Sequence, residues 1–276
     1  MPIGASVMGL ALSRVVESRH PAHRVGDLLM ARLAWEEFSL TDGGDFLVPV
    51  PPNPKHPLSY YLGVLGDTGL SAYFGLIDYG NVKPGESVLV SAAGGAVGSI
   101  AGQLAKLLGA RVVGVASGAD KCARLIAELG YDAAVDRTRG DVGAELTRAC
   151  PAGIDVYFDN VGGPLLEIVL DRINVGARIL MCGAVASYNA GAPLPGPNNL
   201  FQIVTKQAHV HGFMTHMQAE RYEAARAVLS RWIDDGQLRV PEYRLDGIES
   251  TPRAFCDLFR GANFGKTVVR LAAAPR

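Results

Sequence analysis

The chain lacks the features that mark a metalloprotein, a nucleic-acid-binding protein or a membrane protein. It has only 4 cysteines in 276 residues, and no two of them form a Cys-x-x-Cys pair. A structural zinc site or a redox dithiol is therefore not expected. Its net charge is −1, which predicts no basic surface for nucleic acid or an anionic membrane. No apolar run approaches the length of a membrane span.

The few cysteines and histidines are scattered along the chain. The cysteines are expected to be reduced, buried thiols of a cytoplasmic protein. They are Cys122, Cys150, Cys182 and Cys256. His209 and His211 alternate along a strand-like run without a cysteine or carboxylate partner, so we expect surface or satisfied core histidines and no metal site. The N-terminal sequence is apolar without a basic leader, and Gly4 and Gly9 favour a strand over a signal peptide.

The stretch from Ser87 to Lys121 has the pattern of a dinucleotide-binding unit. An apolar strand runs into a glycine turn, which is followed by apolar residues at helical spacing and a second apolar strand. Ala93, Gly95 and Gly98 occupy the glycine positions of the G-x-G-x-x-G motif. Glycines let the backbone approach a pyrophosphate, and the helix N-terminus offers free N–H groups. The alternative is a glycine-rich turn in another α/β protein, but the strand and helix on either side favour cofactor binding.

The end of the second strand distinguishes NADH from NADPH. An NADH site places Asp or Glu at this strand end, where it binds the ribose 2′-hydroxyl. Here the strand ends in Ala116-Ser117-Gly118, no acidic residue comes before Asp120, and Lys121 follows. A small neutral strand end beside a cation suits a 2′-phosphate, so the sequence favours NADPH. The alternative for Lys121 is an ordinary solvated lysine on the next helix.

The order of the segments predicts an α/β protein with a doubly wound parallel Rossmann sheet and a smaller β domain. Residues 61–236 are expected to form the Rossmann domain, because strands and helices alternate from Ser87 onward. Residues 1–56, within a first domain expected over 1–60, have the pattern of β structure, and residues 237–276 return to turns and short strands. Residues 185–199 are rich in Pro, Gly and Asn, and we expect a functional loop at the carboxyl edge of the sheet.

Several segments, spread over almost the whole chain, resemble one family. They are GLSAYFGL, VSAAGGAVGSIAGQLAKLLGARVVG, DKCARLIAELGYDAAVD, IDVYFDNVGG, RILMCGAVASYN, PLPGPNN and ANFGKTVVR. The chain resembles the medium-chain dehydrogenases/reductases, and more narrowly their zinc-independent, NADPH-dependent double-bond reductases, the group of prostaglandin, curcumin and plant alkenal reductases. FDNVGG together with CGAxxxYN is specific to this group. The resemblance implies that residues 1–60 and 237–276 form a partial GroES-like substrate domain.

The resemblance also implies which residues bind NADPH. Ala96 to Ser99 would carry the pyrophosphate, Lys121 would contact the 2′-phosphate, and Asn160 would lie beside the nicotinamide. The matching cofactor-binding positions are Gly95, Ala96, Val97, Gly98, Ser99, Lys121, Arg137, Asn160, Cys182, Gly183, Ala184, Tyr188, Phe213, Met214, Thr215 and Asn263. Without the family match, Asn160 would be interpreted as a strand-end turn residue and Tyr188 as an exposed loop tyrosine.

The reaction that the resemblance implies is metal-independent reduction of the C=C bond of α,β-unsaturated ketones and aldehydes, the expected small-molecule partners. Hydride passes from NADPH to the β-carbon, and the α-carbon is then protonated. Tyr188 is the candidate catalytic residue, because its hydroxyl suits a hydrogen-bond or proton-donor role. The alternative interpretation is a catalytically impaired relative that binds NADPH without turnover. A short-chain dehydrogenase is rejected, because its Tyr-x-x-x-Lys spacing occurs only at Tyr79 and Lys83, ahead of the glycine turn.

Three departures from the family pattern stand out. The chain begins inside the first domain of the family, so we expect an incomplete β sheet with unpaired edges. Asp67-Thr68-Gly69 stands where the family commonly has Met-Pro-Gly, and Arg137 stands where a tyrosine often supports the 2′-phosphate. Arginine binds phosphate well, so the NADPH preference is expected to persist. Family members are often homodimers, and the strand HVHGF is a candidate for pairing between subunits.

Overall fold

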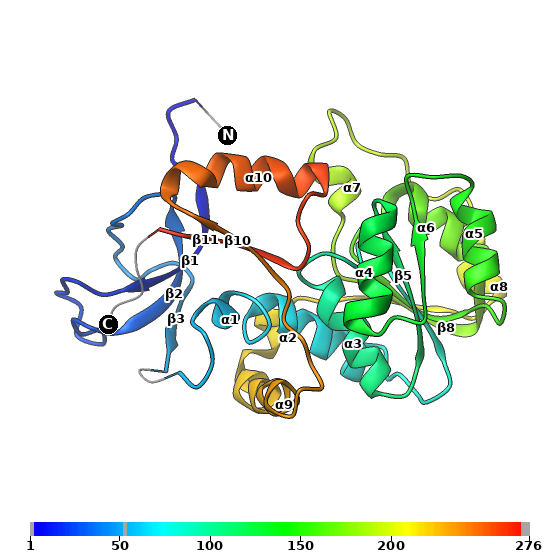
Figure 1. The fold of residues 1–276 in the computed structure, drawn as a ribbon, viewed down its shortest axis with the longest axis horizontal. Helices are drawn as coiled ribbons and strands as arrows, with labels where there is room; N and C mark the ends of the chain where they lie inside the picture. The colour runs from blue at the N-terminus through cyan, green and yellow to red at the C-terminus, as the bar shows by residue number, and fades with distance from the viewer. Residues whose placement is uncertain (1–2, 52–53, 272–276) are drawn as a thin grey trace.

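The computed structural model describes residues 3–51 and 54–271. One end of the molecule is built on a six-stranded sheet covered by helices, and the other end holds a small three-stranded sheet (Figure 1). The predicted fold, a doubly wound parallel sheet with a smaller β part, is confirmed.

The six strands of the large sheet are all parallel and lie in the order β6-β5-β4-β7-β8-β9. They are β4 (Ser87–Val90), β5 (Arg111–Ala116), β6 (Ala133–Asp136), β7 (Ile154–Asp159), β8 (Ile173–Met181) and β9 (His209–Gly212). The chain enters at the centre with β4, moves out to β6, and returns to β7 on the other side. The strand order therefore reverses between β4 and β7, and ligands bind at the carboxyl ends of such strands.

Helices bury both faces of this sheet. Val88 and Val90 of β4 pack into one apolar cluster, which includes buried side chains of α2, α3, α4 and α9, whereas Leu89 packs into a second cluster with α5 and α6. A strand that is buried on both faces has a continuous apolar sequence, which explains the unbroken runs of this region. The helices are α2 (Asp67–Phe74), α3 (Gly98–Leu107), α4 (Ala119–Leu129), α5 (Val142–Ala149), α6 (Gly163–Leu170) and α9 (Tyr222–Asp234).

The small sheet is antiparallel and has the order β1-β2-β3. Its strands are β1 (Met8–Arg14), β2 (Leu28–Ala34) and β3 (Leu47–Val50). Short elements complete the connections between the two sheets and around the large one. They are α1 (Ser59–Leu62), the π-helix η1 (Gly75–Tyr79), α7 (Val185–Tyr188), α8 (Phe201–Thr205) and the 3₁₀ helices η2 (Thr215–Arg221) and η3 (Ile248–Ser250).

The C-terminal segment contains a helix that the sequence analysis missed. Residues 237–276 were expected to hold only turns and short strands, and this expectation is wrong, because α10 (Thr251–Arg260) connects the parallel strands β10 (Glu242–Asp246) and β11 (Lys266–Arg270). Pro252 fits the first turn of a helix, and Gly261 ends α10 in the left-handed conformation. Phe255 of α10 packs edge-on against Trp35, with 5.5 Å between the ring centroids.

The close contact between α3 and Tyr131 generates a prediction about stability. Tyr131 is buried, and a Cβ atom at Gly102 would lie 2.0 Å from Cζ of its ring. We expect Gly102→Ala to lower the free energy of unfolding by about 2 kcal/mol or more, because the ring has no room to move. Urea denaturation followed by circular dichroism measures this change.

Gly191→Ala is the matched control, since a Cβ atom at Gly191 meets nothing within 4 Å. We expect that variant to stay within about 0.5 kcal/mol of the wild type. Equal stabilities of the two variants would contradict the packing described for Gly102.

Candidate active site

A tight glycine turn follows β4 and leads into α3. The N–H of Gly95 donates to the carbonyl of Ala92 at 2.8 Å. A Cβ atom at Gly98 would lie 2.4 Å from the same carbonyl oxygen, so only glycine fits there. Because α3 begins at Gly98, its positive dipole end lies next to the turn, an arrangement that favours an anion such as phosphate. The predicted pyrophosphate residues, Ala96 to Ser99, thus follow the carboxyl end of β4.

Asn160 links the two central strands of the sheet at the switch point. Its side-chain N–H donates to the carbonyl of Ser91 at 2.8 Å, and its backbone N–H donates to the hydroxyl of Ser91 at 2.8 Å. Both residues are buried. Asn160 directly follows the last residue of β7, as expected for a strand-end turn residue. Its side chain also joins β7 to the segment after β4. Ser91 was not singled out in the sequence, because nothing local connects it to a residue 69 positions away.

Asp159 is a second residue that the sequence analysis did not assign. It is fully buried, and its Oδ1 accepts hydrogen bonds from the hydroxyls of Ser91 and Tyr157 and from the N–H groups of Val161 and Gly162. Its Oδ2 has no partner among the residues that the structure describes. The carboxylate therefore fixes the turn that follows β7, and with it the position of Asn160.

A cationic corner lies at the end of β5. Burial lowers the pKa of Lys121, and the positive charges of Arg137 and Arg124 lower it further, so these three cations lie near one another. Ser117 and Lys121 both lie next to Gly261. A Cβ atom at Gly261 would lie 3.7 Å from Oγ of Ser117 and 3.8 Å from Nζ of Lys121, so the two side chains are near each other. An anion in this corner would relieve the repulsion among the cations, which suits a phosphate group.

The segment after β8 lies across the end of β7. The N–H groups of Cys182 and Gly183 both donate to the carbonyl of Asp159, at 2.8 and 3.1 Å. Tyr188, on α7, is 64% exposed, and its hydroxyl accepts a hydrogen bond from the N–H of Ala184 at 3.2 Å. Burial raises the pKa of Cys182 to about 12, with further contributions from the charges of Asp67 and Asp159. Cys182 therefore remains a thiol at neutral pH.

Phe213, Met214 and Thr215 follow β9 at the carboxyl edge of the large sheet. Phe213 stacks on Tyr79 with 5.1 Å between ring centroids. Met214 is exposed, whereas Thr215 is buried and its hydroxyl donates a hydrogen bond to Asp67. Aromatic, thioether and hydroxyl groups thus lie side by side at the carboxyl edge of the sheet.

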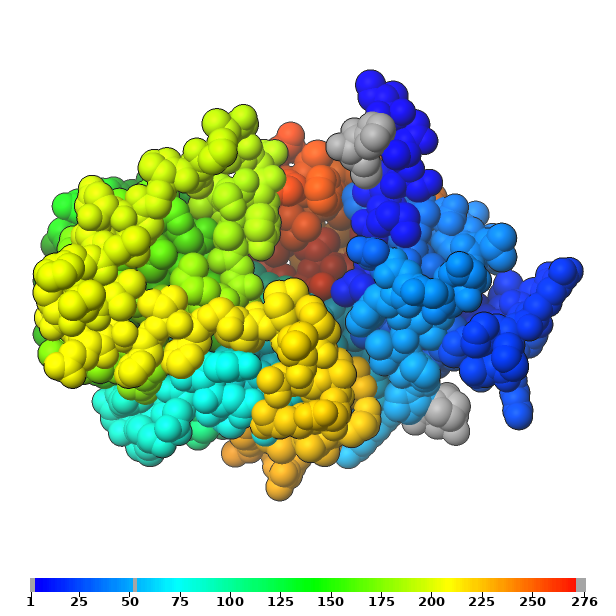
Figure 2. Space-filling view, turned by 180° about the vertical axis from the view of Figure 1, so that it is seen from behind, coloured from blue at the N-terminus to red at the C-terminus, as the bar shows by residue number. Residues whose placement is uncertain are grey.

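The C-terminal segment closes over the glycine turn. The N–H of Gly265 donates to the carbonyl of Gly94 at 2.9 Å, and Gly265 forms a parallel bridge with Gly95. Asn263 is buried nearby, and its side-chain amide donates to the carbonyl of Gly265 at 3.0 Å. Figure 2 shows C-terminal atoms, in red, recessed between the yellow segments and the blue N-terminal segments. The glycine turn, Asn160, the segment after β8 and the C-terminal segment thus meet at the carboxyl edge of the sheet, and the recess beside them is called the cleft below.

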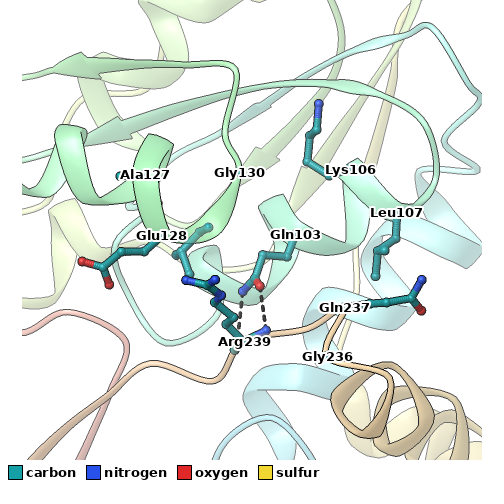
Figure 3. A pocket seen from close by; sticks show the side chains of 10 residues that line it. Gln103, Lys106, Leu107, Ala127, Glu128, Gly130, Gly236, Gln237 and Arg239 are labelled. Atoms are coloured by element: carbon teal, nitrogen blue, oxygen red, sulfur yellow. Dashed lines mark hydrogen bonds between the residues drawn. The ribbon is translucent and has the colours of Figure 1, made fainter.

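A cavity of about 330 Å³ lies elsewhere, along α3, α4 and the loop after α9 (Figure 3). Gln103 spans it, donating to the carbonyl of Arg239 at 2.9 Å and accepting from its N–H at 2.8 Å. None of the predicted site residues lines this cavity. It is therefore separate from the cleft.

The cysteines differ in exposure. Cys122 and Cys150 are buried as predicted, but Cys256 is exposed on α10, so the expectation that every thiol is buried is wrong. Within residues 3–51 and 54–271, no cluster of three or more His, Cys, Asp or Glu side chains is arranged to hold a metal ion. In the same residues, no helix has the length and apolar character needed to cross a membrane.

The strand order, the glycine turn at the switch point and the cationic corner define a dinucleotide-binding protein of the Rossmann type. Comparison with known proteins extends this assignment. The family model described as zinc-binding dehydrogenase matches residues 96–231. The chain belongs to this family, within the medium-chain dehydrogenases/reductases, because the relatives described next cover almost all of it.

Two relatives and one crystal structure show the extent of the similarity. The NADPH-dependent curcumin reductase of Escherichia coli (strain K12) is 40% identical over 275 residues, 98% of this chain and 79% of the relative. The 2-alkenal reductase (NADP(+)-dependent) of Nicotiana tabacum is 37% identical over 270 residues, 98% of this chain and 78% of the relative. CurA from Vibrio vulnificus, crystallised in complex with NADPH, matches with a TM-score of 0.88 at 37% identity and covers 97% of this chain and 80% of its own.

Proposed function

We propose that the protein uses NADPH to reduce the C=C bond of α,β-unsaturated aldehydes and ketones. The observation that carries this proposal is the convergence of the glycine turn, the cationic corner and the Cys182–Tyr188 segment on one cleft. The curcumin reductase and the 2-alkenal reductase, which are similar over nearly the whole chain, support the same substrate class.

The residues present fit NADPH. Because a Cβ atom at Gly98 would meet the carbonyl of Ala92, the turn keeps the close backbone approach that a pyrophosphate needs. The cationic corner offers Lys121 and Arg137 to the 2′-phosphate. Asp136, at the end of β6, is the nearby carboxylate that could bind a ribose hydroxyl. Its Oδ1 is already used, because it accepts hydrogen bonds from the N–H of Gly118 and from Thr138. The site thus favours a phosphate over a free ribose hydroxyl.

The proposed roles of the side chains follow from these positions. NADPH, when bound, supplies the hydride for the β-carbon of the substrate. Asn160, fixed by Ser91, orients the nicotinamide side of the cleft, and the segment from Cys182 to Ala184 forms its wall. Tyr188 donates a hydrogen bond to the substrate carbonyl, where it stabilises negative charge as it develops, and supplies a path for the proton that the α-carbon gains. Phe213 contributes an apolar surface that excludes water.

The positions of the segments support separate regions for cofactor binding and substrate binding. In this proposal residues 61–236 bind the cofactor, and residues 1–60 and 237–276 form the substrate side. The contact of Gly265 with the glycine turn brings the last of these segments to the cofactor. The four free thiols suit a reducing compartment, and we place the protein in the cytoplasm on that basis.

We further propose a homodimer that forms through β9. This strand is the last of the large sheet, so one of its edges has no partner strand among the described residues. Exposed strand edges tend to pair with another chain, and a twofold axis beside β9 would join two sheets into one. Sedimentation velocity at micromolar concentration should give a dimer, and a monomer would contradict this assembly.

The test of the proposed reaction is NADPH oxidation in the presence of an enal or enone. We expect the absorbance of the reduced nicotinamide to fall only when the substrate has a C=C bond conjugated to the carbonyl, and the product to be the saturated carbonyl compound. The matched saturated aldehyde is the control. Tight NADPH binding without oxidation for any enal or enone would support the non-catalytic alternative.

The cationic corner predicts how the enzyme selects its cofactor. Lys121→Ala should weaken NADPH binding about 10- to 100-fold, because a charge-assisted contact to the 2′-phosphate is lost. Binding of NADH, which has no 2′-phosphate, should change much less. Fluorescence titration of both cofactors measures the two affinities. Lys106→Ala is the control, since Lys106 pairs with Asp132 on the surface. Equal losses of NADPH and NADH affinity in Lys121→Ala would contradict the assignment of Lys121 to the 2′-phosphate.

A further inference from the structure

Gln103 is a buried side chain of α3 to which the mechanism above gives no role. Its amide N–H group donates to the carbonyl of Ser99, one turn earlier in the helix, at 2.7 Å and to the carbonyl of Arg239 at 2.9 Å. Its Oε1 accepts from the N–H of Arg239 at 2.8 Å. The two hydrogen bonds to Arg239 are visible in Figure 3. Gln103 thus ties the helix that follows the glycine turn to a segment 136 positions away in the sequence.

Arg239 lies in the segment that leads from α9 to β10. The neighbouring Leu238 is buried in the apolar core, so packing keeps this segment attached to the protein. The cavity of about 330 Å³ is lined by α3, α4 and the same segment, so the packing among them is incomplete at this point. The hydrogen bonds of Gln103 therefore fix the backbone of Arg239 against α3 where close packing does not.

The position of Arg239 is transmitted to the glycine turn through the backbone. Two residues further on, the carbonyl of Pro241 lies against Gly265, because a Cβ atom at Gly265 would lie 1.9 Å from this oxygen. The N–H of Gly265 in turn donates to the carbonyl of Gly94 at 2.9 Å. A chain of close backbone contacts thus runs from Gln103 to the turn that precedes its own helix.

The C-terminal segment also reaches the cationic corner. Phe264 is buried, and a Cβ atom at Gly94 would lie 3.4 Å from Cδ2 of its ring and 3.5 Å from Cδ of Lys121. The guanidinium of Arg124 lies over the same ring, 3.8 Å from its centroid. This segment therefore contacts both the glycine turn and the cations of the corner.

We propose that Gln103 is a positioning residue that holds the C-terminal segment against the glycine turn and thereby slows the release of NADPH. This inference rests on the NADPH site proposed above. Without Gln103, the N–H and carbonyl of Arg239 lose these partners, and the segment opens more often. A cofactor at the turn then leaves faster and binds more weakly.

The experiment measures NADPH release from Gln103→Met, which keeps the length of the side chain and removes its hydrogen bonds to Arg239. We expect the dissociation rate constant and the Kd of NADPH to rise about 10-fold, as the loss of two hydrogen bonds of ordinary strength predicts. Stopped-flow fluorescence, with excess NADP⁺ displacing bound NADPH, gives the rate constant. The KM for NADPH should rise as well, whereas kcat for an enal at saturating NADPH should be retained.

Gln237→Met is the matched control, because it makes the same change at an exposed residue of the same segment. It should leave NADPH release at the wild-type rate. Gln103→Glu keeps an acceptor for the N–H of Arg239 but cannot donate to its carbonyl, so it should release NADPH faster than the wild type. This variant provides the test if Gln103→Met does not fold.

Hydrogen exchange shows whether the change is local. In Gln103→Met, residues 236–241 and 261–265 should exchange faster, while β4 and β7 keep their wild-type rates. Faster exchange in these segments with unchanged NADPH release would overturn the proposal, and so would a lower kcat with unchanged NADPH affinity.

The failure of this role and the failure of the proposed reaction give different results, because NADPH release is measured without substrate. Wild-type release from Gln103→Met would refute the role of Gln103 and leave the enone reductase function intact. A wild type that binds NADPH but reduces no enal would refute the reaction alone. A wild type that does not bind NADPH would refute both.

Discussion

The hydrogen bonds between Ser91 and Asn160 are the constraint on which the candidate site depends. They join the carboxyl ends of β4 and β7, the strands between which the strand order reverses. Asp159 extends this connection, because its carboxylate fixes Ser91 and the turn after β7, while its backbone carbonyl holds Cys182 and Gly183. One buried cluster thus sets the positions of three separate loops. A site that must place a cofactor accurately gains from having its loops fixed by the same few atoms.

Charge defines the cofactor corner more than shape does. Burial and the positive charges of Arg137 and Arg124 lower the pKa of Lys121, so an anion is favourable beside it. Asp136 could have neutralised them, but hydrogen bonds from Gly118 and Thr138 hold its Oδ1. In the proposed site, this arrangement of charges favours a 2′-phosphate over an uncharged ribose hydroxyl.

Much of the fold was predictable because its signals are local. The glycine turn, the alternation of strands and helices, and the small neutral end of β5 are each visible within a few residues. Helix α10 also has local signals, namely Pro252 near its start and Gly261 after its end. Both residue types are common in turns as well, so they did not identify the helix. Ser91 and Asp159 could not be found in this way. Their partners are brought close only by the order of the strands in the sheet, which a single short motif does not contain.

The environment of Cys182 has a consequence for an enzyme that handles electrophiles. Conjugated carbonyl compounds alkylate thiolates, and Cys182 lies at the end of β8, beside the proposed cofactor site. Burial and the neighbouring carboxylates hold this sulfur in its protonated, unreactive form. The packing around Cys182 therefore also lowers the reactivity of its thiol towards conjugated carbonyl compounds.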